Sequence, residues 1–114
     1  MKTQADLDKS HLDLITRLNN LAFLDDGRPD PIELNEVRIV WDHECEEEVQ
    51  LMSEAEFPYL HAHMLAHIII SKYFLRIDSE SSNAFLIVNL ITEIAHHIET
   101  YDQQFLDYLK TRNK

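Results

Sequence analysis

The chain is poor in the residues that break or cross-link a fold. Its 114 residues include one glycine, three prolines and one cysteine. So few glycines and prolines leave few turn signals, and no alternating pattern typical of β-strands extends over a useful length. The lone cysteine, Cys45, cannot form an internal disulfide, which agrees with a reducing compartment. A strand-rich or disulfide-stapled fold is therefore not expected.

Positive charge and long apolar runs are also scarce. Ten Lys and Arg residues stand against 21 Asp and Glu residues, a formal net charge of -11, which repels nucleic-acid phosphates and anionic lipids. No apolar run approaches the length of a bilayer. The segment from Met1 to Asp6 lacks the apolar stretch of an export signal. We therefore expect no nucleic-acid partner, no membrane association and a cytoplasmic location.

Apolar residues recur at three- and four-residue intervals over four stretches, which predicts amphipathic helices. We expect the first helix to end near Phe23 and the second to run from Pro31 to about Ala55, with Asp30 as its N-cap. Pro58 can open a third helix. The fourth is expected over Ala84–Thr111.

The connections between these helices are short. They fall at residues 25–31, around Pro58, and in the polar segment 78–83. Short loops between sequential helices favour antiparallel neighbours. The length suits one domain, residues 1–114. The predicted fold is therefore all-α, an up-down-up-down antiparallel four-helix bundle with a site for two metal ions in its core.

Imidazoles and carboxylates interrupt the predicted apolar faces. The pairs His43 with Glu47, and His63 with His67, are four residues apart and so share a helix face. A buried polar group without a partner costs about 2–7 kcal/mol, which metal coordination would offset. The expected inward set is His11, His43, Glu47, His63, His67, His97 and Asp102.

The donor set contains imidazole and carboxylate but no thiolate, which suits iron, manganese or zinc. Two carboxylates can bridge two ions and leave one coordination position open. A lone histidine on an apolar face is more often a satisfied core residue, so a metal-free helical interaction module stays as an alternative. His61 and His96 are offset from the cluster and are expected at the surface.

The order of these motifs resembles the hemerythrin family, the cation-binding domains that include single-domain bacterial members. The matching elements are Asp8-x-x-His11, His43-x-x-x-Glu47, Met52 before Phe57-Pro58, His63-x-x-x-His67, and His97 with Asp102. The resemblance implies two irons. One would be held by His63, His67 and His97 and the second by His11 and His43, with Glu47, Asp102 and an oxo or hydroxo group as bridges. Dioxygen would bind at the iron with fewer histidines.

Three positions depart from the family pattern. Glu93 stands where the family often has a tryptophan, and Glu44 stands where a phenylalanine commonly follows the ligand histidine. The interval from Glu47 to Met52 is one residue longer than usual. A π-bulge would absorb that residue, or Glu48 would replace Glu47 as the bridge; the four-residue spacing from His43 favours Glu47.

The leading functional hypothesis is a di-iron protein that binds dioxygen, or a related small ligand such as peroxide or nitric oxide, as a carrier, store or sensor. The alternatives are an oxidase, peroxidase or iron-binding protein in which Glu93 modifies the open site, with manganese or zinc as other metals. Ferritin-like chemistry needs two Glu-x-x-His motifs. Only Glu93-x-x-His96 is present.

Overall fold

The structure is a computed structural model that describes residues 3–25, 28–79 and 84–112. Apart from one isolated bridge between Phe23 and Pro29, the regular structure of these residues is helical. The elements are α1 (Gln4–Asn19), α2 (Pro31–Glu54), α3 (Leu60–Ser79), α4 (Ala84–His97), the π-helix η1 (Ile98–Asp102) and α5 (Gln103–Arg112). The all-α prediction is confirmed. Residues 26–27 and 80–83 of the predicted connections lie outside the described residues.

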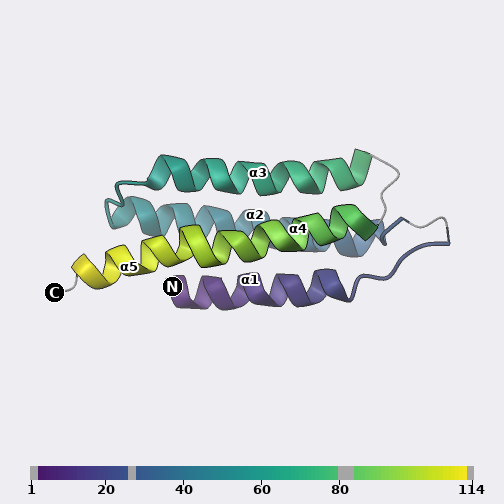
Figure 1. Cartoon of the computed structure of the whole chain (residues 1–114), viewed down its shortest axis with the longest axis horizontal. Helices are drawn as coiled ribbons and strands as arrows, with labels where there is room; N and C mark the ends of the chain where they lie inside the picture. Colours follow the sequence, from purple (N-terminus) through teal and green to yellow (C-terminus); the bar gives the residue numbers. More distant parts are fainter. Residues whose placement is uncertain (1–2, 26–27, 80–83, 113–114) are drawn as a thin grey trace.

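The helices lie side by side along the long axis of the molecule (Figure 1). The molecule measures 55 × 21 × 19 Å along its three principal axes. Helices α4, η1 and α5 follow one another without a break. Helix α1 contacts α2 and α4, and α3 contacts the same two helices. We call α1, α2, α3 and the continuous run of α4, η1 and α5 the four rods of the fold. The four rods enclose a common interior. Among the described residues, no helix combines the length and apolarity that a bilayer crossing requires.

The helix ends follow the local sequence. Asp30 caps α2 as predicted, because its carboxylate accepts a hydrogen bond from the Ile32 N–H, with Pro31 in the first turn. The expected end of the first helix near Phe23 is wrong, since α1 stops at Asn19. The backbone beyond it forms cross-loop hydrogen bonds, including Asp30 N–H to the Ala22 carbonyl. Helix α3 begins at Leu60, two residues after Pro58.

The buried face of α2 differs from the predicted one. We expected Leu34, Val37, Val40, His43, Glu47 and Leu51 to point inward; the buried residues are Leu34, Val37, Trp41, Glu44, Glu48 and Met52. The two sets diverge after Val37, by one residue. The observed face encloses the whole Trp41 side chain, and a tryptophan buries more apolar area than the valine beside it. Helix α2 is therefore rotated relative to the prediction.

The core consists of a polar layer between two apolar clusters. The larger cluster includes Trp41, Phe74 and Ile94. The smaller contains Met52, Ala55, Phe57 and Phe105. Along α2, α3 and the continuous run from α4 to α5, the buried histidines and acids fall between residues of the larger cluster and residues that belong to the smaller cluster or pack against it. Apolar packing on both sides thus fixes the depth of the polar layer.

Candidate metal centre

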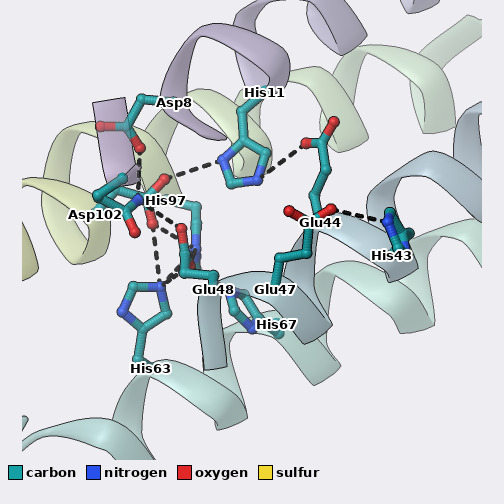
Figure 2. Close-up of polar contacts among 11 residues, drawn as sticks. Asp8, His11, His43, Glu44, Glu47, Glu48, His63, His67, His97 and Asp102 are labelled. Carbon is teal, nitrogen blue, oxygen red and sulfur yellow. Dashed lines mark hydrogen bonds and ion pairs between the residues drawn. The ribbon is translucent and has the colours of Figure 1, made fainter. Parts of the chain in front are cut away.

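The polar layer brings together side chains from all four rods (Figure 2). Helix α1 contributes Asp8 and His11, α2 contributes Glu48, and α3 contributes His63 and His67. His97 ends α4, and Asp102 ends η1. Except for Asp8, which is half-buried, these side chains are all buried. Their nitrogen and oxygen atoms form two groups, which we call position A and position B.

Position A consists of three imidazoles around one carboxylate, from Glu48, His63, His67 and His97. Glu48 Oε1 lies 2.6 Å from His63 Nε2 and 2.8 Å from His67 Nε2. The same oxygen is 3.7 Å from His97 Nε2. All three imidazoles therefore present the same nitrogen to one point.

Position B consists of one imidazole and three carboxylates, from Asp8, His11, Glu48 and Asp102, with one donor atom of each within 4.8 Å of the others. His11 Nδ1 donates to Asp102 Oδ2 over 3.1 Å. Glu48 belongs to both positions. Asp102 also reaches position A, because its Oδ1 lies 3.1 Å from His63 Nε2 and 3.0 Å from His97 Nε2. Glu48 and Asp102 are therefore the two carboxylates placed to bridge a pair of ions.

The buried charges shift one another's pKa values. Burial raises the pKa of Asp102, but the hydrogen bond from His11 and the imidazoles of His63 and His97 outweigh burial and lower it. The pKa of Glu48 is likewise lowered, because hydrogen bonds from imidazoles overcome burial. For His63, burial lowers the pKa, yet both bridging carboxylates together raise it to about 9. The layer thus keeps Glu48 and Asp102 ionised and holds a proton on His63.

The half-buried Asp8 has a different balance. Burial and the negative charge of Asp102 raise its pKa to about 7, against a smaller lowering by the Gln4 amide. Gln4 Nε2 donates to Asp8 Oδ1 over 2.8 Å and to Glu48 Oε2 over 2.6 Å. This buried amide therefore fixes the orientation of two carboxylates in position B.

The geometry of position A fits a metal ion. The Nε2 atoms of His63 and His97 lie 3.0 Å apart. Two nitrogens bound to one ion at about 2.1 Å and at a right angle are separated by about 3.0 Å. Asp102 Oδ1 is wholly buried and has no hydrogen-bond partner among the described residues, despite its closeness to two imidazoles. An ion between these atoms would replace the contacts that the two imidazoles make with each other, and it would bind the Asp102 oxygen that has no hydrogen-bond partner among the described residues.

The structure does not bring His43 and Glu47 into this centre, which corrects the prediction for both. The His43 side chain is 68 % exposed and pairs with Glu47 on the outside of α2, with 2.8 Å between Nε2 and Oε1. Glu48 takes the inward place that was assigned to Glu47. Counting from Glu48 removes the extra residue before Met52. The π-bulge considered for α2 is accordingly absent, because α2 is α-helical from Pro31 to Glu54.

The other predicted modulating residues lie around the centre. Glu44 is buried with its Oε2 3.3 Å from His11 Nε2, the nitrogen that faces away from Asp102. A carboxylate on the far nitrogen is the usual outer partner of a metal-bound imidazole.

Glu93 is half-buried and lines a cavity of about 140 Å³ beside His97 and Tyr101. His61 and His96 are exposed, as expected.

Sequence reasoning missed Gln4, the position of Asp8, and Trp41. A helical spacing signal was available for the first two, since Gln4, Asp8 and His11 follow one another at four and three residues. Trp41 packs its ring against His11, His67 and His97, with ring centroids 5.0 to 5.7 Å apart. The large apolar side chain of Trp41 was the signal that would have identified the buried face of α2.

A mainly apolar groove of about 340 Å³ lies between α2 and α3. It is lined by Cys45, Glu46, Val49, Met64, Ile68 and His67, the last of which belongs to position A. Burial raises the pKa of the Cys45 thiol far above its ordinary value, so this cysteine presents an uncharged thiol.

Comparison of the chain with family models, with curated proteins and with solved structures returns no match. The resemblance to hemerythrins therefore rests on the residues themselves. After the correction in α2, those residues are His11, His63, His67, His97 and Asp102, with Glu48 in place of Glu47.

Proposed function

We propose that this protein is a dinuclear metal protein of hemerythrin type, an up-down-up-down antiparallel bundle with iron at position A, whose small-molecule ligand is dioxygen. The observation that carries the proposal is the sharing of Glu48 between two groups of donors in one buried layer. A carboxylate common to two ligand sets is what a pair of neighbouring ions requires.

The chain's own residues have distinct parts in this proposal. His63, His67 and His97 would bind one ion through Nε2, and Glu48 and Asp102 would bridge to the second. Bound iron would supply the electrons and open coordination that dioxygen binding needs. Trp41 and the apolar clusters would exclude water from the layer, and the groove beside Met64 and Ile68, which His67 also lines, would offer dioxygen an apolar entrance.

The test is reconstitution of the metal-free chain with Fe²⁺ without oxygen, followed by admission of air. We expect two ions per chain by elemental analysis and a visible absorption band that disappears when oxygen is removed. His67→Ala should lose one ion and the band. His43→Ala removes an equally large imidazole from the outside of the same bundle and should leave both unchanged. A colourless protein with no bound iron would refute the proposal.

A second candidate is an oxidase or peroxidase that uses the same centre. It is favoured by position B, where one imidazole and three carboxylates replace the two-histidine set that the resemblance implies, and by Glu93 in the cavity beside His97. This version predicts turnover of peroxide that falls in Glu93→Gln while the iron content stays constant. A stable oxygenated form that releases dioxygen intact would speak against it.

A further inference from the structure

The two positions differ in the chemistry of their donors. Position A offers three imidazole nitrogens, whereas position B offers one, from His11. Carboxylate oxygens make up the rest of position B, from Asp8, Glu48 and Asp102. Imidazole suits iron and zinc, while carboxylate suits magnesium, calcium and manganese. The same buried layer therefore offers metal ions two different ligand sets, one rich in imidazole nitrogen and one rich in the harder carboxylate oxygen.

We propose that the two positions select different metals, iron at position A and Mn²⁺ at position B, so that the loaded protein holds a mixed-metal centre. This inference rests on the proposed dinuclear function and deepens it. Mn²⁺ fits better than the other hard ions. Mg²⁺ retains several waters and Ca²⁺ takes six to eight oxygens, whereas position B is mostly buried and includes an imidazole.

Independent contacts support position B as a built site rather than a gathering of acids. Gln4 Nε2 donates to Asp8 Oδ1 and to Glu48 Oε2, which holds both carboxylates in place. Asp102 Oδ2 accepts a hydrogen bond from His11 Nδ1 over 3.1 Å, which sets these two groups side by side. Glu44 lies on the far nitrogen of His11 and so orients that ring. A neighbouring side chain thus holds each of the four residues of position B.

The experiment loads the metal-free full chain, without oxygen, from a solution with equal Fe²⁺ and Mn²⁺. Anomalous diffraction at the iron and manganese absorption edges then gives the manganese-to-iron ratio at each position. Fe²⁺ binds most nitrogen and oxygen sites more tightly than Mn²⁺, so the manganese-to-iron ratio at position B is compared with the ratio at position A rather than with one. We expect the ratio to be at least about tenfold higher at position B.

A variant that changes only the donor type sharpens the test. Asp8→His gives position B a second imidazole and should lower its manganese-to-iron ratio toward that of position A. Asp13→His makes the same change at an exposed position of α1 and should leave the ratio as it was. Metal content of each variant, measured by elemental analysis, shows whether both positions still fill.

The outcomes separate the two proposals. Iron at position A together with the same manganese-to-iron ratio at position B would overturn the selectivity and leave the dinuclear function standing. An unchanged ratio in Asp8→His, with both positions filled, would also overturn it. Failure of position A to bind iron would refute the proposed function itself, and with it the mixed-metal centre.

Discussion

His97 Nε2 lies 3.0 Å from Asp102 Oδ1, although five residues of a regular α-helix would turn the two side chains about 140° apart. The π-helical turn Ile98–Asp102 removes that difference, because its hydrogen bonds join residues five apart. One extra residue in the last rod therefore brings a histidine and an aspartate into the same polar layer.

Shortening this turn by one residue should preserve metal binding, whereas lengthening it by one residue should abolish metal binding. Deleting the exposed Thr100 leaves the histidine and the aspartate four residues apart, on one face of an ordinary α-helix, and metal binding should persist. Inserting an alanine after Thr100 should turn Asp102 and Phe105 by about 100°. The insertion should abolish metal binding and cost about 3–5 kcal/mol, the cost of losing a buried phenylalanine.

Urea unfolding of the metal-free variants and elemental analysis of the loaded ones measure these effects. Equal metal content in the insertion variant and the original chain would show that the π turn does not set the position of Asp102.

Metal binding should release protons at pH 7. The pKa of His63 is raised from 6.5 to about 9 in the metal-free protein, so this imidazole is protonated at pH 7 and must lose its proton to bind an ion through Nε2. Affinity should therefore rise with pH up to about 9. Calorimetric titration with Zn²⁺ in two buffers of different ionisation enthalpy counts the protons, and identical heats in both buffers would contradict the expectation.

The same raised pKa makes the stability of the metal-free chain depend on pH. A group whose pKa is higher in the folded state stabilises that state fully below its unfolded pKa, here about 6.5, and the contribution is lost as pH rises through about 9. The loss from His63 is on the order of 3 kcal/mol. Denaturant midpoints for the original chain and His63→Gln across this range isolate it, since the variant should show a smaller decline.

Substitutions on α2 can test which face points inward. Trp41→Ala should lower the free energy of unfolding by about 3–5 kcal/mol, because the side chain is fully buried. Val40→Ala changes a half-buried neighbour and should cost about 1 kcal/mol. The reverse ranking in urea unfolding would restore the predicted face with His43 and Glu47 inside.

The end of α2 offers a stabilising substitution. Glu56 has a φ of 55°, the left-handed conformation that glycine adopts at lower cost, in a turn where the Phe57 N–H donates to the Met52 carbonyl. Glu56→Gly should raise the free energy of unfolding by about 1 kcal/mol. Glu54→Gly, two residues earlier and still helical, should lower it by a similar amount. A thermal midpoint that falls in both variants would argue against this turn geometry.

The sequence predicted the helical class because apolar spacing is a strong signal over long helices. It also assigned His11, His63, His67, His97 and Asp102 to the interior, where the structure brings them together. It failed on α2, where two faces one residue apart carry similar patterns, with His43 and Glu47 on one and Glu44 and Glu48 on the other. Burial of Trp41 against three other helices decides between them, and spacing within a single helix contains no such information.

The orientation of α2 has a consequence for how the chain tolerates change. Saturation mutagenesis along this helix should find broad tolerance at His43, Glu46 and Glu47 and sharp intolerance at Trp41, Glu48 and Met52, in a pattern that repeats with the helical turn. The acidic stretch of α2 would then contain, side by side, positions that accept many substitutions and positions that accept few.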